Sequence, residues 1–173
     1  GWPQASDTSS EAAVVMEDST NTILYSKNAD EVLFPGSTVK IMTCLLALEN
    51  TQLTDEVTMT ATGVSGVTDG GASISSQVDE VFTVEQCLYA IMVASANDIA
   101  LQIAEHVGGS VDGFVQQMNT RAQELGCTNT VFTNPTGLPD NNQHTTAHDM
   151  ALIMQAAIQN ESFRTIAAAT SYT

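Results

Sequence analysis

Residues 38–50, TVKIMTCLLALEN, carry more apolar side chains than one face of a surface helix can hold. Val39, Met42 and Leu46 recur at helical spacing, and the apolar residues between them extend the stripe around the helix. A helix that is apolar on most of its surface must be covered by other elements. We therefore predict that these residues form a central helix of the core, beginning after FPGS at residues 34–37.

A hairpin is predicted before this helix, and further helices are predicted after it. AAVVME and TILYSK, separated by the turn residues DSTN, predict a hairpin over residues 12–27 that follows a flexible polar tail at residues 1–10. Residues 51–82 are expected to form loops and brief strands. Four helices are predicted after these loops. The first begins at the capping pair Thr83 and Gln86 and contains VEQCLYAIMVA, and the second begins at about Asn97 and stops at Gly108 and Gly109. The third follows Ser110 and ends at Gly126, and the fourth begins at Thr146 and Asp149 and reaches Ile158. The predicted class is α+β, with an N-terminal β-hairpin and a mostly helical body.

The charge balance excludes one class of partner. Lys and Arg number 4 against 20 Asp and Glu, so the formal net charge is −16, and such a surface repels nucleic acid phosphates and anionic lipids. With 173 residues and 43% hydrophobic content, the chain is long enough for one compact domain. Because basic residues are scarce, the two lysines, Lys27 and Lys40, each require a specific explanation.

No metal or cofactor site is predicted. Cys44, Cys87 and Cys127 show neither a CxxC pair nor the Cys/His spacing typical of zinc, so we expect buried free thiols. His144 and His148 are four residues apart, but His144 is expected to precede the helix. Packing and capping therefore explain this pair better than metal binding does.

Ser37 and Lys40 form the candidate reactive pair. Residues three apart in a helix lie on one face, so the Ser37 hydroxyl and the Lys40 amine can come within hydrogen-bonding reach. Burial against so apolar a helix would lower the pKa of Lys40 and allow its amine to accept a proton. A serine at a helix N-terminus also lies near free backbone N–H groups that can stabilise an oxyanion. The alternative for S-x-x-K alone is that the serine caps the helix and the lysine extends into solvent.

A second pattern, S-x-N, would supply a hydroxyl for proton relay and an amide that orients the lysine and the substrate. It occurs at residues 19–21, 26–28 and 95–97. The first two lie in the predicted hairpin, where turn chemistry explains them. Ser95 and Asn97 lie instead in a short break between two apolar helices, where polar side chains would face an interior cleft. Capping of the second helix by Asn97 is the alternative.

Together these segments resemble the low-molecular-mass penicillin-binding D-alanyl-D-alanine carboxypeptidases, which are serine peptidases with the motifs S-x-x-K, S-x-N and K-T-G. The resemblance covers about residues 11–160. Its segments are AAVVMEDSTNTILYSKNADEVLFPGSTVKIMTCLLALE, MVASANDIALQIAEHVGG and MNTRAQELGCTNTVFTNPTGLPDNNQHTTAHDMALI. It implies the serine β-lactamase/penicillin-binding-protein-like fold, also called the DD-peptidase fold, for residues 11–173.

The resemblance implies a role for each motif residue. Ser37 would be the acylated nucleophile and Lys40 its base. Ser95 would relay a proton toward the departing D-alanine, and Asn97 would hold the lysine and the substrate amide. The implied substrate is a peptidoglycan stem peptide ending in D-Ala-D-Ala, with β-lactams as covalent inhibitors and no cofactor. The implied location is extracytoplasmic, with the signal peptide already removed.

The K-T-G motif of the family is absent from this sequence. The two Thr-Gly pairs, at residues 62–63 and 136–137, follow alanine and proline rather than lysine. In the family, this motif lies on a later strand that supplies part of the oxyanion hole. The resemblance therefore implies that residues 11–173 are an incomplete catalytic domain whose later strands are missing. A hairpin alone would leave open edges, so we expect a second polypeptide to carry the K-T-G strand, either a cleaved remainder of the same precursor or an omitted segment.

Two other functions stay open at this point. A class A β-lactamase shares the first two motifs, but it needs a glutamate after S-x-N to activate water, and VFTNPTGLPD, residues 131–140, contains none. A non-catalytic penicillin- or peptide-binding fragment would keep the fold without turnover. The four motif residues argue against such a fragment, whereas the absent K-T-G argues for it.

Overall fold

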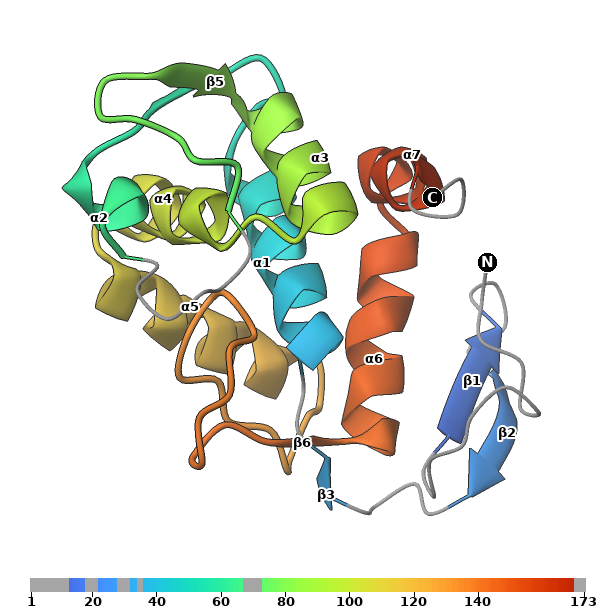
Figure 1. Cartoon of the computed structure of the whole chain (residues 1–173). Coiled ribbons are helices and arrows are strands. Elements are labelled where there is room, and N and C mark those ends of the chain that lie inside the picture. The colour runs from blue at the N-terminus through green and yellow to red at the C-terminus, as the bar shows by residue number, and fades with distance from the viewer. Residues whose placement is uncertain (1–12, 18–21, 28–31, 34–35, 67–72, 170–173) are drawn as a thin grey trace.

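The computed structural model describes residues 13–17, 22–27, 32–33, 36–66 and 73–169. Its helices pack around one another, and short strands lie at the margin of this helical body (Figure 1). The predicted tail at residues 1–10 and the predicted hairpin turn at residues 18–21 lie outside the described residues.

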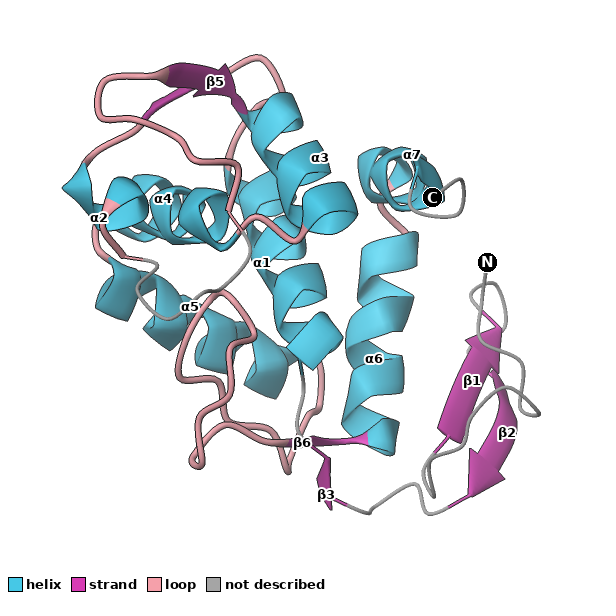
Figure 2. Cartoon of the chain, viewed as in Figure 1, coloured by secondary structure: helices cyan, strands magenta, loops and turns pink. Residues whose placement is uncertain are grey.

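The helices are α1 (Gly36–Asn50), α2 (Ala61–Val64), α3 (Val84–Ala94), α4 (Asn97–Gly108), α5 (Val111–Glu124), α6 (Ala147–Ile158) and α7 (Glu161–Ala168). The strands are β1 (Ala13–Glu17), β2 (Thr22–Lys27), β3 (Val32–Leu33), β4 (Glu56–Thr58), β5 (Val81–Thr83) and β6 (Thr145–Thr146). In the described ranges they form antiparallel pairs, β1 with β2, β3 with β6 and β4 with β5 (Figure 2). The predicted α+β class is confirmed.

Helix α1 is the central helix, as its apolar sequence predicts. It contacts α3, α4, α5, α6 and α7, and Figure 1 shows it in the middle of the helical body. One core cluster joins it to α3, α4 and α7, and a second joins it to α5 and α6. Leu45, Leu88, Phe114 and Ile153 from these helices are at most 2% exposed. Each such side chain contributes about 1.5–3 kcal/mol when it is fully buried.

Local capping signals fix where several helices begin and end. Thr83 and Gln86 exchange two hydrogen bonds of 3.2 and 2.9 Å, which confirms the predicted capping box of α3. Ser110 and Thr146 each accept a bond from the backbone N–H three residues later, at 2.9 and 3.1 Å. Gly109 ends α4 with a φ of 80°. The hairpin predicted over residues 12–27 is confirmed by the pairing of β1 with β2.

Helix α7 is not predicted by the sequence analysis, which ends its last helix at Ile158. Asn160 starts α7 by accepting a bond from the Phe163 N–H at 3.0 Å. The helix has 8 residues, and its buried residues are Phe163 and Ile166. Two buried apolar positions are too few to produce a clear helical period in the sequence.

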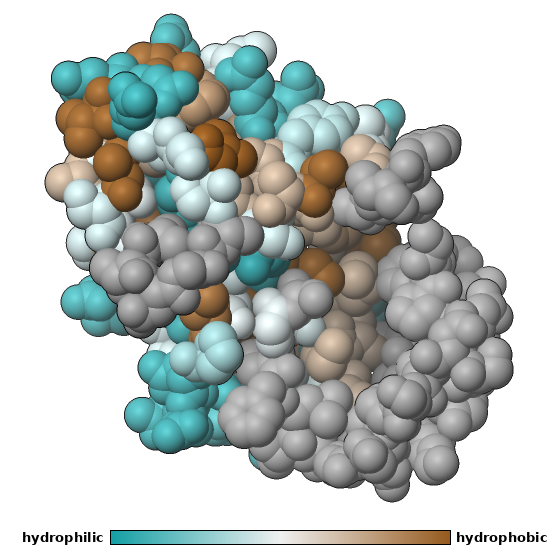
Figure 3. Space-filling model, viewed as in Figure 1, coloured by the Kyte–Doolittle hydropathy of each residue, from teal (hydrophilic) through white to brown (hydrophobic). Residues whose placement is uncertain are grey.

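No helix in the described part of the chain is both long and apolar enough to cross a membrane. The large apolar side chains that are exposed include Val78, Val81 and Val93. On the face that Figure 3 shows, apolar atoms form several small groups among polar ones rather than one broad patch.

Candidate active site

The start of α1 places two predicted site residues one turn apart. The helix begins at Gly36, so Ser37 lies in its first turn and Lys40 follows three residues later on the same face. The backbone N–H groups of a first turn have no partner within the helix and can bind an anion. The Ser37 side chain lies outside the described part of the structure. Its pairing with the lysine amine therefore stays a prediction.

Lys40 lies in an environment that favours a neutral amine. Its side chain is half-buried, and its Nζ donates a hydrogen bond of 2.5 Å to the backbone carbonyl of Thr136. Burial lowers the pKa of Lys40, and a negative charge on the Cys44 thiolate, one turn further along α1, would oppose that effect. Burial also raises the pKa of Cys44 to about 12, so this thiol stays neutral near neutral pH. A lysine with a lowered pKa can accept a proton from a nearby hydroxyl.

A loop far along the chain, residues 133–138, covers this end of α1 and supplies the carbonyl that the lysine binds. The neighbouring carbonyl of Pro135 accepts a bond of 2.9 Å from the Thr43 hydroxyl. Gly137 has a φ of 84°, and a Cβ there would lie 2.3 Å from the carbonyl oxygen of Gly36. Glycine is therefore required for this close approach. Sequence analysis missed this contact because proline and glycine mark an ordered turn without indicating what it touches.

The predicted S-x-N residues lie where α3 meets α4, with Ser95 as the C-cap of α3 and Asn97 as the first residue of α4. Ser95 is exposed and has left-handed backbone angles, φ 53° and ψ 38°. Such a conformation costs a residue other than glycine about 1–3 kcal/mol and is typical of functional sites. Asn97 is 3% exposed, and its Oδ1 has no hydrogen-bond partner among the described residues. Ala96 is the N-cap of α4, so the alternative that Asn97 caps this helix is wrong.

The two motifs lie on helices that touch each other, because α1 contacts both α3 and α4. Among the described contacts, the Lys40 amine binds the Thr136 carbonyl, and a bond to Asn97 is not one of them. The roles assigned to Ser37, Lys40, Ser95 and Asn97 therefore stay predictions.

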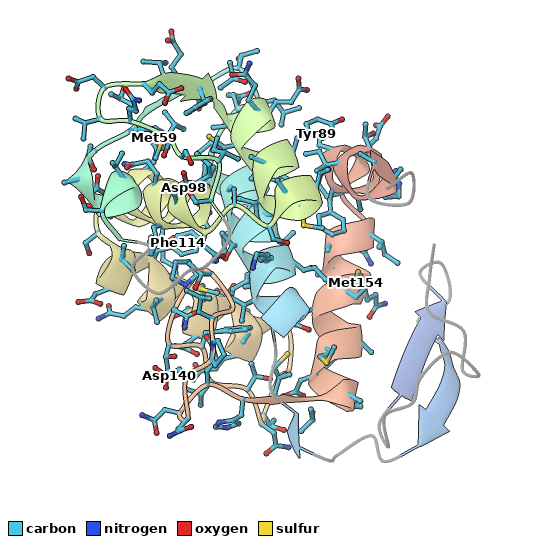
Figure 4. The ribbon with its side chains drawn as sticks, in the orientation of Figure 1. Met59, Tyr89, Asp98, Phe114, Asp140 and Met154 are labelled. Atoms are coloured by element: carbon cyan, nitrogen blue, oxygen red, sulfur yellow. The ribbon has the colours of Figure 1, made fainter. Side chains whose placement is uncertain are left out.

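Asp98 anchors a second loop beside the S-x-N connection, and sequence analysis did not identify it. Its carboxylate, 1% exposed and labelled in Figure 4, accepts a bond of 2.6 Å from the Ser76 hydroxyl. It also accepts bonds from the backbone N–H groups of Ser76 and Ile74, at 3.2 and 3.3 Å. Burial by itself would raise the pKa of Asp98, but the hydrogen bonds from residues 73–76 lower it below its ordinary value.

Replacing Asp98 with asparagine is expected to reduce the free energy of unfolding by about 2–3 kcal/mol at pH 7, because an amide donor would face backbone donors. The folded pKa of Asp98 is lowered, so its stabilisation is present above the unfolded value of about 3.9 and disappears as pH falls through the folded value. Urea unfolding of the unmodified protein and of Asp98→Asn should show that the difference in their free energies of unfolding decreases below about pH 4. Asp112→Asn, at an exposed site, serves as the control. A difference that is constant with pH would contradict this account.

The two histidines considered for metal binding have ordinary surroundings. His144 Nδ1 lies 3.2 Å from the Asn142 carbonyl, and His148 Nδ1 lies 3.6 Å from the Asp149 carboxylate. In the described residues, no cluster of three or more His, Cys, Asp or Glu side chains could hold a metal ion. Cys44, Cys87 and Cys127 are buried and free, as predicted.

A hollow of about 410 Å³ lies elsewhere, near the C-terminal end of α1. Its lining includes Glu49 and Arg121, which form an ion pair of 2.7 Å with each other. None of the four predicted site residues lines it. Because its charged groups are already paired, this hollow is not the candidate active site.

Comparison with known proteins points to one family. The sequence profile described as D-alanyl-D-alanine carboxypeptidase matches residues 2–172. The D-alanyl-D-alanine carboxypeptidase DacF of Bacillus subtilis is 38% identical over 156 residues, which cover 87% of this chain and 39% of DacF. DacC of Escherichia coli is 33% identical over 166 residues, which cover 91% of this chain and 41% of DacC. The chain therefore spans well under two thirds of these relatives.

Solved structures agree with the sequence comparison. The D-alanyl-D-alanine carboxypeptidase DacD from Francisella tularensis superposes with a TM-score of 0.84 at 32% identity, over 96% of this chain and 41% of that one. A mutant of the Streptomyces K15 DD-transpeptidase gives a TM-score of 0.83 at 32% identity, over 90% of this chain and 64% of that one. The predicted fold is thereby confirmed over nearly the whole chain.

Proposed function

The chain belongs to the D-alanyl-D-alanine carboxypeptidase family, peptidase family S11, and on this premise we propose that it acts as a serine-type D-Ala-D-Ala carboxypeptidase. The reaction would remove the terminal D-alanine of a peptidoglycan stem peptide. The observation that supports the proposal is the half-buried Lys40, three residues after Ser37, whose lowered pKa would allow its amine to act as a base.

In the acylation step, the Ser37 hydroxyl oxygen attacks the carbonyl carbon of the penultimate D-alanine while Lys40 takes its proton. The first turn of α1 supports this step, because its free backbone N–H groups can stabilise the negative oxygen of the tetrahedral intermediate. As the C–N bond breaks, the proton held by Lys40 passes through the Ser95 hydroxyl to the amine nitrogen of the departing D-alanine, which leaves the Lys40 amine neutral again. Asn97 fits the role of binding the substrate amide, because its buried Oδ1 has no partner among the described residues.

Water then attacks the ester on Ser37, which releases the shortened peptide and restores the hydroxyl. A β-lactam presents a strained amide to the same serine, so we expect it to acylate Ser37 and to act as a covalent inhibitor. The chemistry of these four side chains needs no cofactor.

A segment carrying the K-T-G strand would complete this site, and a second polypeptide could supply it. The hairpin of β1 and β2 supports this part of the proposal, because it is a pair of strands in the described residues and can accept a further strand at its edge. Because peptidoglycan lies outside the cytoplasmic membrane, the proposed location is extracytoplasmic.

The loop at residues 133–138 weakens the β-lactamase alternative. A class A enzyme needs a glutamate to activate the deacylating water, but this loop instead directs a backbone carbonyl at Lys40. A non-catalytic binding fragment would form the covalent adduct with a β-lactam but would release no D-alanine from a peptide.

Asn97 gives a prediction that separates activity from stability. Because its buried oxygen has no partner among the described residues, Asn97→Leu should leave the free energy of unfolding unchanged or raise it by about 1 kcal/mol. The same change should slow acylation by penicillin about tenfold or more, because a group that orients the substrate is lost. Urea unfolding and the rate of adduct formation measure the two effects. A variant that loses stability but acylates normally would refute the role of Asn97.

The proposal is tested by intact-protein mass spectrometry before and after addition of benzylpenicillin, with digestion to locate the adduct. We expect one penicillin-sized mass increase on the peptide that contains Ser37. Release of D-alanine from a peptide ending in D-Ala-D-Ala, with the K-T-G segment present, then establishes turnover. An adduct on another residue would overturn the assignment of the nucleophile, and an adduct without D-alanine release would favour the binding fragment.

A further inference from the structure

The loop that contacts Lys40 is organised by two side-chain amides. Gln143, 2% exposed, accepts bonds of 2.9 and 3.2 Å from the backbone N–H groups of Thr133 and Asn134. Its own Nε2 donates to the Asn134 Oδ1 at 3.2 Å. One buried glutamine therefore satisfies the first backbone donors of the loop and also fixes the asparagine beside them.

Asn134 holds the remainder of the loop. Its Oδ1 accepts further bonds from the Gly137 N–H at 2.9 Å and the Thr136 hydroxyl at 3.2 Å. Its Nδ2 donates to the Leu138 carbonyl at 3.0 Å. The Thr136 hydroxyl in turn accepts from the Leu138 N–H at 3.1 Å. In this loop without regular secondary structure, the backbone N–H groups of Gly137 and Leu138 are thus bound by side chains of the loop itself.

The consequence is that two successive carbonyls of this loop face α1. The Pro135 carbonyl accepts from the Thr43 hydroxyl, and the Thr136 carbonyl accepts from the Lys40 amine. A lysine side chain has four flexible bonds and loses entropy when it is held in one place. A rigid acceptor at a fixed position therefore determines where the amine lies.

We propose that Gln143 and Asn134 are positioning residues for the reaction, which hold the Thr136 carbonyl against Lys40 and thereby fix the amine near Ser37. This inference rests on the proposed function, in which Lys40 is the base. Neither amide touches the reacting atoms, so both act through the loop. A small displacement of a catalytic group can reduce a rate by about 10²-fold, which is the size of effect expected here.

The first test follows the titration of the lysine amines and needs no substrate. The chain has two lysines, Lys27 and Lys40. In protein labelled with [ε-¹³C]lysine, NMR titration follows both amines, and Lys27 serves as the internal reference. Cys44 is the titratable group that would act on Lys40 once it ionises, and it is present in every variant. In Gln143→Met the loop should loosen and admit water, so the midpoint for Lys40 should move upward by about 1 pH unit.

Gln102→Met is the matched control. Gln102 is also 2% exposed, and it accepts bonds from the backbone N–H groups of Thr60 and Gly63, at 2.8 and 3.3 Å, at the start of α2. Its loss should destabilise the protein to a similar degree without moving the Lys40 midpoint. An unchanged midpoint in Gln143→Met, or an equal shift in both variants, would overturn the proposal.

A second pair of variants covers the case in which Gln143→Met does not fold. Thr136→Val removes the hydroxyl that binds Asn134, whereas Thr136→Ser keeps it. We expect the valine variant alone to shift the Lys40 midpoint, and equal behaviour of the two would refute the inference.

The rate of penicillin acylation links the positioning to the reaction. It should fall about 10²-fold in Gln143→Met and less than about threefold in Gln102→Met. A shifted midpoint with an unchanged rate would show that the amides hold the loop without serving the reaction. Failure of the unmodified protein to form any adduct would instead refute the proposed function, while the NMR titration would still report whether the amides position Lys40.

Discussion

Replacing Ser37 with alanine is expected to abolish the penicillin adduct and the release of D-alanine while leaving the fold intact. The change removes the proposed nucleophile, and no ester can form without its oxygen. Alanine has a high helix propensity, so the first turn of α1 should persist. Intact-protein mass spectrometry after saturation with benzylpenicillin should show the unmodified mass alone. Circular dichroism and urea unfolding report whether α1 and its contacts are retained.

Ser110→Ala is the control for loss of a serine at a helix start. The Ser110 hydroxyl caps α5 by accepting the Gly113 N–H at 2.9 Å. Its loss should reduce the free energy of unfolding by about 1 kcal/mol without affecting the adduct. An adduct that persists in Ser37→Ala, or one that disappears equally in Ser110→Ala, would contradict the assignment of Ser37.

The parts of the fold that sequence analysis predicts are those with local causes. The capping box of Thr83 and Gln86 depends on residues three apart, and the structure shows both of its bonds. The burial of α1 follows from the composition of one segment, because a helix apolar on most sides has to be covered. Helix α7 lacks such a signal, since its packing depends on contacts with helices distant in the sequence.

In the candidate site too, features with local causes can be predicted from the sequence, whereas long-range contacts cannot. The S-x-x-K spacing makes Ser37 and Lys40 a candidate pair, because a helix brings residues three apart onto one face, and the resemblance to the family then predicts their roles. The contact between Lys40 and the Thr136 carbonyl joins residues 96 positions apart, and a backbone carbonyl leaves no mark on the sequence. Gln143 is similarly hidden, because a buried glutamine resembles a surface one until its partners are known. Long-range hydrogen bonds to the backbone are therefore the part of this site that needed a structure.

Changing Lys40 tests whether the amine acts as a base or only as a positive charge. Lys40→Met removes the amine and should slow penicillin acylation by about 10²–10⁴-fold, the usual contribution of a general base. Lys40→Arg keeps the charge and can still donate to the Thr136 carbonyl, but a guanidinium cannot give up its proton in a protein. We therefore expect the arginine variant to be as slow as the methionine variant. Mass spectrometry of samples quenched at successive times measures the rate of adduct formation for each variant. Lys27→Arg is the control at the other lysine.

The pH dependence of the same rate separates the two interpretations further. Because burial lowers the pKa of Lys40, the unmodified protein should acylate faster as pH rises through that value and the amine becomes neutral. Both Lys40 variants should lose this rise, since neither has a group that changes protonation there. If Lys40→Arg instead kept most of the rate, the positive charge would be the required feature. Another group would then have to accept the Ser37 proton.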